Sequence, residues 1–562
     1  MYRSLQEYVD FLESKDELIR IKEFVDPILE IAHVTNLVSK KEGGGKALLF
    51  ENTGTKYPVL TNMMGSEKRI KYALGINSFD DISERINSFI SDVMKEKKGM
   101  MDKIKLLPIL NNASNWLPVN IKGHAPCQDS IQYAAKLSDL PILKCWPQDG
   151  GRFITLPLVH TNSPVTGTRN VGMYRMQVFS ENSTGMHWHI HKTGAKHLEE
   201  CTHRLPVAVC LGGDPVYTYA ATAPLPEGID EYILAGFLRN KQVELVQCFT
   251  QDIKVPADCD FVFEGYVQKS EPKVVEGPFG DHTGFYSLAD KYPTFHITCI
   301  THRNNAIYPA TIVGIPPQED KYIALATEKI FLTPIQLAIA PEIEDLYLPE
   351  EGIGHNFAVI KIKKSYPGQA IKIANALWGA GQMMFSKFII IVSENIDIRN
   401  RHSLAEEISK NYSPQRDTIL SRGPLDILDH TAPICGYGGK ICIDATVKTT
   451  DEKTLGDEVS LKSSFIEFTH KKHIENNENG NPLISVILDE DADTSNSYNS
   501  LWLLGCNCDP ERDSEIKNGT LILDARSKKG RKNFTREWPD MVEADKTTID
   551  AVNKRWNKLG ID

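Results

Sequence analysis

The amino-terminal part of the chain combines the apolar spacing of helices with a short apolar strand. Apolar residues recur at helical spacing through residues 4–40, and an apolar run at 47–50 follows three glycines. A second helical pattern covers residues 81–97, and prolines interrupt the chain beyond it. These patterns predict a first α/β domain that occupies residues 1–115.

The middle of the chain changes to short runs of β-branched and aromatic residues, which are separated by turn residues. Many short strands with few helices are typical of a β-barrel. We therefore expect a barrel domain over residues 116–315. Its expected strands lie at 153–161, 170–179, 186–191, 206–212, 215–220, 243–249, 261–267, 295–303 and 306–314.

Beyond Pro316, helical and strand-like patterns alternate again. Helical spacing covers residues 321–340 and 368–383. Apolar runs at 358–362 and 387–393 have the composition of buried strands. Alternation of this kind predicts a separate α/β domain over residues 316–450.

The remaining chain contains an internal repeat. Four residues that follow the apolar strand at 387–393 recur 96 positions later: Asp397, Pro414, Arg416 and Asp417 become Asp493, Pro510, Arg512 and Asp513. Farther on, GGKICIDAT around Asp444 is echoed by NGTLILDAR around Asp524, with an offset of 80. Chance similarity between two α/β units is the alternative to a true repeat.

The repeat leads to a specific structural prediction. Residues 482–526 should fold as a shortened copy of residues 387–446 and pack beside it. The strands expected at 484–488 and 520–524 would correspond to those at 388–392 and 440–444. Residues 451–562 would then hold a polar spacer, the shortened copy and a terminal helix.

Composition narrows the class of protein. With 562 residues, 41% of them hydrophobic and 24% charged, the chain has ordinary globular usage and enough length for three or four domains. A formal net charge of −11 disfavours a nucleic-acid surface, which needs clustered lysine and arginine, so small molecules are the expected ligands. We expect neither a signal peptide nor a membrane span, and we expect the 11 scattered cysteines to be reduced. These features predict a cytoplasmic protein.

Two clusters of residues could carry chemistry. His187, His189 and His191 alternate, so a strand would present all three on one face, and histidine is the commonest metal ligand. The segment EGPFGDHTG at 276–284 places Glu276 and Asp281 around glycines, which let the backbone approach a ligand closely. Each cluster has a plain alternative, because the histidines need further ligands to form a metal site and the acidic segment can be an ordinary turn.

Four motifs together resemble the UbiD family of prenylated-FMN-dependent decarboxylases. NVGMYR (170–175), MHWHIHKTG (186–194), EGPFGDHTG (276–284) and GGKICIDAT (438–446) occur in the order, and with roughly the separation, found in that family. The flanking stretches LSDLPILKCWP and DLYLPEEG look like the same family, and the resemblance extends over about residues 1–450. Together with the repeat, it implies an α+β fold with an N-terminal α/β domain, a central split β-barrel that binds the flavin, and a C-terminal α/β domain with a partly duplicated unit.

The resemblance also implies a set of site residues. The catalytic residues would be Arg175, Glu276 and Asp281, and the metal ligands would be Asn170, His191 and Glu231. The prenylated FMN would contact Met173, Tyr174, Arg175, His187, Trp188, His189, Lys192 and Thr193, with Lys440 at its phosphate. The metal would be Mn²⁺ or Mg²⁺, which suits oxygen and imidazole ligands, and K⁺ is a further ion that the resemblance allows. From the residues alone, Glu231 is simply an acid at a helix amino terminus and Lys440 a solvated lysine.

The implied activity is the reversible, non-oxidative decarboxylation of an aromatic acid through a covalent adduct with prenylated FMN. Arg175 would orient the substrate carboxylate, and Glu276 would hold the guanidinium. Asp281 would deliver the proton, provided that burial or the nearby Glu276 raises its pKa from about 4. A hydroxyaromatic quinone precursor is the first choice of substrate, and a simple hydroxybenzoate or a cinnamate-like acid is the alternative. A flavin prenyltransferase would supply the cofactor, and we expect a homo-oligomer, either a dimer or a hexamer.

Two hypotheses from other classes stand beside this one. A metal-dependent hydrolase would use the histidine run and the acidic turn to bind zinc, and it would need no flavin. A non-catalytic flavin-binding subunit would account for the second carboxy-terminal copy, which we expect to make no flavin contact and to enlarge a subunit or oligomer interface.

Overall fold

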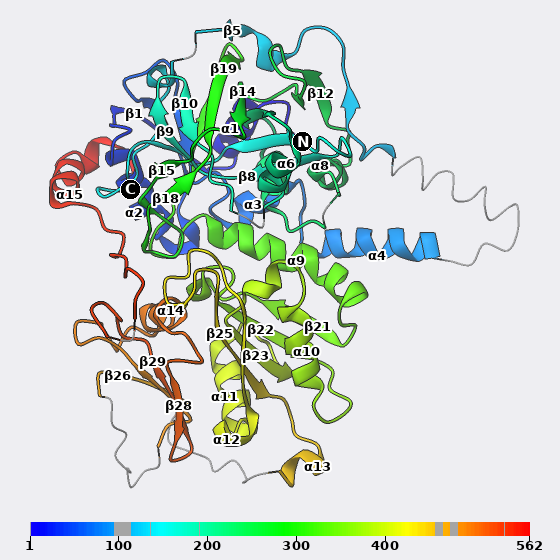
Figure 1. Cartoon of the computed structure of the whole chain (residues 1–562), viewed down its shortest axis with the longest axis vertical. Helices are drawn as coiled ribbons and strands as arrows, with labels where there is room; N and C mark the ends of the chain where they lie inside the picture. Colours follow the sequence, from blue (N-terminus) through cyan, green and yellow to red (C-terminus); the bar gives the residue numbers. More distant parts are fainter. Residues whose placement is uncertain are drawn as a thin grey trace, which may run out of the picture. The chain divides into compact units, whose positions relative to one another are not determined.

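The structure, a computed structural model, describes residues 2–94, 114–134, 136–189, 192–226, 228–455, 465–471, 481–532 and 534–561. The chain forms two compact units, Met1–Ile323 with Met541–Asp562, and Ala324–Asp540 (Figure 1). The end of the chain therefore belongs to the first unit, where the predicted terminal helix α15 (Lys546–Asn553) packs near α2 (Glu30–Ser39) and Arg555 pairs with Glu30. The finer division of the chain at residues 115, 315 and 450 stays a prediction.

The amino-terminal sheet has the order β1-β2-β3-β20. Its strands are β1 (Leu18–Phe24), β2 (Ala47–Asn52), β3 (Val59–Thr61) and β20 (Tyr308–Pro309), and the helices before the central sheet are α1 (Leu5–Ser14), α2, α3 (Glu67–Leu74) and α4 (Asp80–Met94). The predicted strand and the helices are confirmed, the pattern at 81–97 as far as Met94 because 95–97 lie outside the described residues, but β1 was missed. Its buried residues Leu18 and Ile21 are three positions apart, which imitates a helix, whereas parallel pairing with β2 makes the segment a strand.

A nine-stranded sheet follows the order β6-β9-β10-β19-β14-β11-β7-β8, with β5 on β19. Its strands are β5 (Ser130–Gln132), β6 (Phe153–Ile154), β7 (Leu158–Asn162), β8 (Arg169–Met173), β9 (Met176–Ser180), β10 (Ser183–Gly185), β11 (Arg204–Leu211), β14 (Phe261–Gln268) and β19 (Thr294–His302). β8 ends the path and β9 lies next to its other end, yet only Tyr174 and Arg175 separate them in the sequence. Two residues reach about 7 Å, so the sheet must curl until its ends nearly meet. The predicted split barrel is confirmed, and Arg175 lies at its seam.

Two of the expected barrel strands, at 243–249 and 306–314, form strands that belong to other sheets, and two more are not strands where the structure describes them. Residues 215–220 form helix α7 (Pro215–Thr222), because Asp214 accepts from Val216 N–H at 3.2 Å and Pro215 suits the first helical position. Residues 186–189 follow β10 as irregular chain, and 190–191 lie outside the described residues. Shorter elements complete this unit: β4 (Val119–Asn120), α6 (Thr193–Glu200), α8 (Glu231–Arg239), β12 (Glu244–Gln247), β13 (Lys254–Pro256), and the hairpin strands β15 (Val274–Glu276), β16 (Phe279–Gly280), β17 (Tyr286–Ser287) and β18 (Asp290–Tyr292).

The second unit is built on a sheet of order β21-β22-β23-β25-β24. Its elements are α9 (Asp320–Ala338), β21 (Ile343–Tyr347), β22 (Phe357–Ile362), α10 (Gln369–Trp378), β23 (Phe388–Ser393), α11 (Arg401–Asn411), α12 (Pro414–Asp417), β24 (Thr418–Pro424), β25 (Tyr437–Ala445) and α13 (Thr450–Lys453). Alternate residues of β23 enter two cores: Ile389 and Ile391 pack with α10, and Phe388 and Val392 pack in a core that includes α11 residue Ile408. The helical and strand patterns predicted for 321–393 are confirmed.

The predicted repeat is present in this unit. β26 (Ile466–Thr469), β27 (Ile484–Ile487), α14 (Ser497–Asn507), β28 (Ser514–Lys517) and β29 (Thr520–Asp524) repeat the order and strand directions of β22, β23, α11, β24 and β25. The helix caps repeat too, since Asn400 and Asn496 accept from Ser403 and Asn499 N–H, both at 3.1 Å. β26 was not predicted, because it lies in the stretch that was expected to be a polar spacer. Residues 456–464 and 472–480 of that stretch are outside the described residues.

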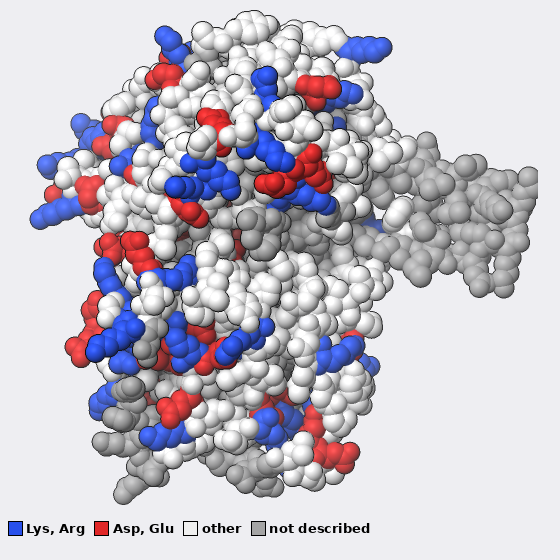
Figure 2. All heavy atoms as spheres, in the orientation of Figure 1, with Lys and Arg blue, Asp and Glu red and all other residues white. Residues whose placement is uncertain are grey.

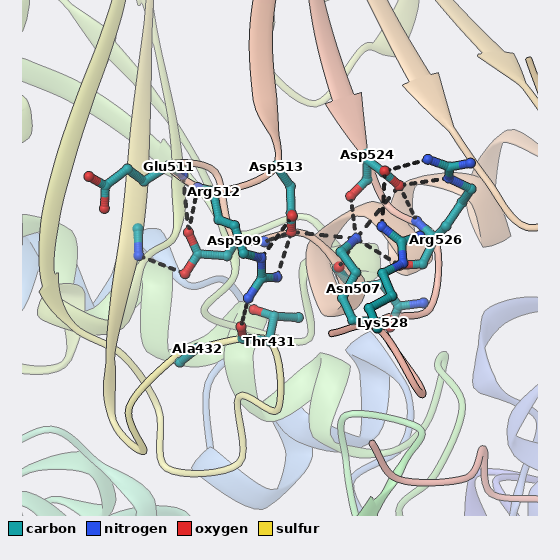
Figure 3. A network of polar contacts seen from close by, with 12 residues as sticks. Thr431, Ala432, Asn507, Asp509, Glu511, Arg512, Asp513, Asp524, Arg526 and Lys528 are labelled. Carbon is teal, nitrogen blue, oxygen red and sulfur yellow. Dashed lines mark hydrogen bonds and ion pairs between the residues drawn. The ribbon is translucent and has the colours of Figure 1, made fainter. Parts of the chain in front are cut away.

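The copy packs beside its parent, as predicted, and Figure 3 shows the polar contacts that join them. Asp509 of the copy accepts from Gly439 N–H at 3.0 Å, and a Cβ at Gly439 would lie 2.3 Å from an Asp509 oxygen. The glycine pair of the GGK motif therefore leaves the space in which the second copy packs. Arg512 donates to Thr431 O at 2.7 Å, and apolar residues of both copies share one core.

Each copy has a buried lysine after its last strand that donates hydrogen bonds to backbone carbonyl oxygens. Lys448 donates to Asp444 O at 2.7 Å, and its counterpart Lys528 donates to the carbonyls of Asp524 and Arg526, both at 2.7 Å. The Lys528 side chain is 2% exposed and lies 3.5 Å from Asp513 Oδ2. We expect Lys528→Met to lower the free energy of unfolding by ~3 kcal/mol in urea, because buried carbonyl and carboxylate oxygens lose their donor.

Lys529→Met is the matched control for this prediction. Its side chain is 70% exposed and pairs with Asp540 at 3.2 Å, so the loss should not exceed ~1 kcal/mol. Equal losses for the two variants would contradict a stabilising role for Lys528.

The surface and the cysteines agree with the composition. On the face drawn in Figure 2, lysine and arginine side chains lie among aspartate and glutamate side chains. Within the described ranges, no helix is long and apolar enough to span a membrane. All 11 cysteines are described, and none of them forms a disulfide in the structure.

Candidate active site

The guanidinium of Arg175 contacts three side chains at the seam of the curled sheet. Nε donates to Glu276 Oε1 at 3.0 Å, and Nη2 donates to Ser287 Oγ at 2.9 Å. Nη1 donates to Asp281 Oδ2, and the guanidinium carbon lies 4.8 Å from the centre of the Phe279 ring. The side chain is 9% exposed. Its planar donors are thus held in the geometry that can receive a carboxylate.

Glu276 ends β15 with a fully buried side chain. His187 donates to it from Nδ1 at 2.8 Å. Burial alone would raise the pKa of Glu276, but the hydrogen bond from His187 and the charge of Arg175 hold that pKa below its ordinary value. Among the described residues, Oε2 finds no hydrogen-bond partner. An ionised Glu276 therefore anchors Arg175 and keeps one buried oxygen available to a ligand.

The pKa expected for Asp281 is wrong. Burial would raise it, but the charge of Arg175 and the hydrogen bonds of His282 lower the pKa of Asp281 well below its ordinary value. His282 donates to Asp281 Oδ1 from Nδ1 at 2.9 Å and from its backbone N–H at 2.8 Å. Asp281 is therefore ionised in this structure, and a role as proton donor requires its ion pair with Arg175 to change first.

Glycine positions the acidic loop. Gly277 has a φ of 97°, in the region that favours glycine, and its N–H donates to Gln177 Oε1 at 2.7 Å. Ser287 Oγ accepts from Phe279 N–H at 3.2 Å as well as from Arg175. The loop is therefore attached to β9 and β17, which brings Glu276 and Asp281 to the same arginine.

Aromatic side chains lie beside this ion-pair cluster. The rings of His187 and His189 are 4.4 Å apart, and Tyr292 lies 4.3 Å from the His187 ring. The strand predicted for the histidine run is not formed at 186–189, where Trp188 N–H donates to Met186 O at 2.7 Å in an irregular segment, and His191 lies outside the described residues. The Tyr174 and Trp188 rings are perpendicular at 6.4 Å, and Met173, which ends β8, is half-buried.

One end of α6 could bind a phosphate. Lys192 is the N-cap residue and Thr193 the first residue of this helix, and no side chain caps its backbone N–H groups. Trp188 Nε1, next to this terminus, is buried and has no partner among the described residues, and a Cβ at Gly194 would lie 2.6 Å from the indole. A flavin with a phosphate tail fits these donors.

Glu231 is hydrogen-bonded to the residue that follows Asn170, another of the three predicted metal ligands. Glu231, the first residue of α8, accepts from Val171 N–H at 2.8 Å, and Asn170 precedes Val171 in β8. Burial raises the pKa of Glu231 to about 7, and the backbone donors and the charge of Arg169 only partly offset this effect. A divalent ion fits that deficit, although among the described residues no group of three or more histidine, cysteine or acidic side chains forms a metal site. His191, the third predicted ligand, lies outside the described residues.

Lys440 belongs to the second unit and is not a solvated lysine. It is 1% exposed in β25, and Nζ donates to Ser386 O at 3.2 Å and to Met384 O. Burial lowers the pKa of Lys440 to about 7. Thr520 takes its place in the copy and donates to Pro482 O at 2.7 Å, so the copy keeps the hydrogen bond but not the cation.

Sequence reasoning missed the residues that support the cluster. Ser287, Tyr292, Gln177 and His282 each contact a predicted site residue or its loop. Only His282 belongs to a quoted motif. The other three lie on β9, β17 and β18, where polar or aromatic residues are ordinary strand composition, so no local signal marks them.

Comparison with known proteins gives three family matches along the chain. The N-terminal, Rift-related and C-terminal domains of 3-octaprenyl-4-hydroxybenzoate carboxy-lyase match residues 9–86, 119–316 and 321–445. An uncharacterized protein of Aquifex aeolicus (strain VF5) is 47% identical over 455 residues, which cover 80% of this chain and 93% of that protein. An uncharacterized protein of Helicobacter pylori (strain J99) is 35% identical over 599 residues, covering 98% of this chain and 96% of that protein.

Two solved structures share the fold. The UbiD-class enzyme HmfF from Pelotomaculum thermopropionicum, in complex with FMN, has 25% sequence identity and a TM-score of 0.66, covering 81% of this chain and 97% of that one. Vanillic acid decarboxylase of Sedimentibacter hydroxybenzoicus, in closed form, has 28% identity and a TM-score of 0.70, covering 81% of this chain and 95% of that one.

Proposed function

The chain belongs to the UbiD family of carboxy-lyases, and on that premise we propose that it reversibly decarboxylates a hydroxyaromatic acid of the quinone-precursor type. The observation that carries the proposal is the buried Arg175 fork, which contacts Glu276 and Asp281 at the motif positions of the family. A simple hydroxybenzoate or a cinnamate-like acid is the alternative substrate. The relative that decarboxylates vanillic acid favours the hydroxybenzoate alternative.

Prenylated FMN is the cofactor that we propose for this site. It would lie against Met173, Tyr174, His187, Trp188 and His189, with its phosphate at Lys192, Thr193 and Lys440. The partnerless indole N–H of Trp188 and the amino terminus of α6 support this placement, as do the relatives solved with FMN and with prFMN. When bound, the cofactor supplies the electron sink for carbon–carbon bond cleavage.

Arg175 would bind the substrate carboxylate through Nη1 and Nη2, because Nε stays on Glu276. A bound carboxylate competes with Asp281 for the guanidinium. The pKa of Asp281 should then rise, since burial continues to disfavour its charged form. Asp281 could thus take up a proton on Oδ2 and give it to the carbon from which CO₂ has left. In the carboxylation direction, Asp281 would remove that proton.

We propose Mn²⁺ or Mg²⁺ at Asn170, His191 and Glu231, where it would join the protein to the cofactor phosphate, with K⁺ as a further ion. Glu231→Gln should therefore lower flavin occupancy in the purified protein, measured by absorbance and by metal analysis. Glu244→Gln, on the exposed part of β12, is the control and should keep both. Full flavin and metal content in Glu231→Gln would refute this ligand assignment.

The remaining proposals concern the setting of the enzyme. A flavin prenyltransferase would supply the cofactor in the cytoplasm, and the protein would act as a homo-oligomer, either a dimer or a hexamer. The second copy, without a lysine at the Lys440 position, would make no flavin contact and would enlarge the subunit or an interface. A flavin-free sample that hydrolyses substrates with zinc would favour a metal hydrolase instead.

Activity can be tested directly. The protein is co-expressed with a flavin prenyltransferase, purified under nitrogen and incubated with a panel of naphthoates, hydroxybenzoates and cinnamates. We expect loss of the acid with release of CO₂, and exchange of labelled bicarbonate into the substrate. Bound prenylated flavin with no turnover on the whole panel would favour a non-catalytic flavin-binding subunit.

A further inference from the structure

A second carboxylate lies directly behind the catalytic loop. Asp149 is 4% exposed, and its Oδ1 accepts from Gly280 N–H at 2.7 Å, one residue before Asp281. Its Oδ2 accepts from Cys145 and Trp146 N–H at 3.0 and 2.9 Å. One side chain thus joins the turn at 145–150 to the loop that carries the proposed proton donor.

The same turn contacts the loop in two further ways. Gly150 N–H donates to Pro278 O at 2.8 Å. The Trp146 ring lies against Gly280, where a Cβ would be 2.3 Å from Trp146 Cδ1, and the indole N–H is fixed on Val313 O at 2.9 Å. Because Gly280 has no space for a side chain, a small shift of the turn must move the backbone that carries Asp281.

The charge of Asp149 is held by backbone dipoles. Burial raises the pKa of Asp149 to about 7, and the three N–H groups only partly offset it. Lys144, at the start of the turn, is the cation that acts on it, with a smaller effect than any of those N–H groups. The other titratable groups on the adjoining elements are Cys145 on the turn, Glu276, Asp281 and His282 on the loop, and Tyr286, whose hydroxyl accepts from Gln148 N–H at 3.3 Å.

We propose that Asp149 is a positioning residue that holds the catalytic loop only while it is ionised, so that its protonation releases Gly280 and misplaces Asp281. Oδ2 already accepts two N–H groups, so the proton would go to Oδ1, the oxygen that accepts from Gly280 N–H. A hydroxyl oxygen is a weaker acceptor than a carboxylate oxygen, so the hydrogen bond to the loop weakens. In its effect on turnover, the inference rests on the proposed decarboxylase function.

The expected pH dependence has opposite signs for activity and stability. Turnover should fall as the pH drops through about 7, because the loop loses its anchor. Stability from this group should rise over the same interval, since a raised carboxyl pKa means that the folded state takes up the proton before the unfolded state does. An ordinary structural acid would not make activity and stability diverge in this way.

Asp149→Asn and Asp260→Asn form a matched pair. Asp260 is buried like Asp149, accepts from Gly213 and Ile307 N–H at 2.9 and 3.0 Å, and has a pKa that burial raises to about 7. Asparagine at position 149 must face a backbone donor with its own NH₂ group. We expect Asp149→Asn to lower kcat about 10²-fold at pH 8 with little change in KM. The fall of turnover as the pH drops through about 7 should be absent in this variant. Asp260→Asn should keep both the kcat and the pH dependence of the wild type.

A readout without substrate separates this inference from the proposed function. In flavin-free protein labelled with 5-fluorotryptophan, the resonance of Trp146, identified with Trp146→Phe, should titrate near pH 7 in the wild type and in Asp260→Asn but not in Asp149→Asn. If the wild type decarboxylates nothing yet this titration occurs, the proposed function fails and the coupling of Asp149 to the turn stands. A Trp146 resonance without a titration near pH 7, or an unchanged pH profile in active Asp149→Asn, would overturn the inference.

Discussion

Asp281→Asn is expected to lower turnover by a factor on the order of 10²–10⁴ while the flavin and the substrate still bind. Asparagine keeps the size of the side chain and its acceptor oxygen for His282, but it cannot deliver a proton. Asp281 is 7% exposed, so bulk water reaches its carboxylate poorly. Single-turnover decay of the acid, with flavin absorbance as a measure of cofactor content, tests the expectation.

The control for Asp281→Asn is a variant that loses another acidic side chain near the same strands. Asp290 is exposed on β18 and pairs across the hairpin with Glu276 through the backbone only, so Asp290→Asn should keep full turnover. Normal turnover in Asp281→Asn would transfer the proton-donor role to Glu276. Loss of flavin from Asp281→Asn would instead show that the residue supports binding.

The internal repeat could be predicted because its recurring residues make local contacts. Arg416 bonds to Asp417, its neighbour in the chain, and Arg512 bonds to Asp513 in the same way, with Nε–Oδ1 distances of 2.8 Å in both copies. A contact between neighbours in the sequence is encoded within one short motif. The recurrence of these residues 96 positions later therefore predicted both the contacts and the strands that flank them.

Elements decided by distant partners could not be predicted in this way. Residues 215–220 have strand composition, yet their two tyrosines are buried inside helix α7, where packing outweighs propensity. The alternating histidines at 187 and 189 suggested a strand, but β10 ends at Gly185. An alternating sequence pattern places its side chains on one face of a strand only when a neighbouring strand pairs with the segment.

The candidate site could be predicted in part for the same reason. Motif resemblance identified Arg175, Glu276 and Asp281, and the structure brings these three together. The pKa of Asp281 could not be predicted from the motifs, because it depends on Arg175, which is distant in the sequence. Asp149 likewise acts on Gly280 across the fold, and its DGG sequence is typical of any turn.

Arg175→Met is expected to lower kcat/KM by about 10²–10⁴-fold, equivalent to ~3–5 kcal/mol. Methionine fills similar space but leaves Glu276 and Asp281 buried without their shared cation, and it offers nothing to a substrate carboxylate. Steady-state kinetics, with urea unfolding in parallel, measures the effect on turnover apart from the effect on stability. Arg204→Met is the control: Arg204 also lies over a ring, 4.3 Å from the centre of Tyr266, but it is exposed, so its loss should leave kcat/KM unchanged.

Arg175→Lys separates charge from geometry. A lysine ammonium keeps the positive charge, and it should hold the pKa of Glu276 and Asp281 down, but it cannot bond to Glu276, Asp281 and Ser287 at once in one plane. If orientation of the carboxylate is what Arg175 contributes, Arg175→Lys should regain the stability of the wild type while recovering only a small part of its turnover. Recovery of both together would mean that the site needs a cation and not a fork, and Arg175 would then act by neutralising the two acids rather than by aligning the substrate.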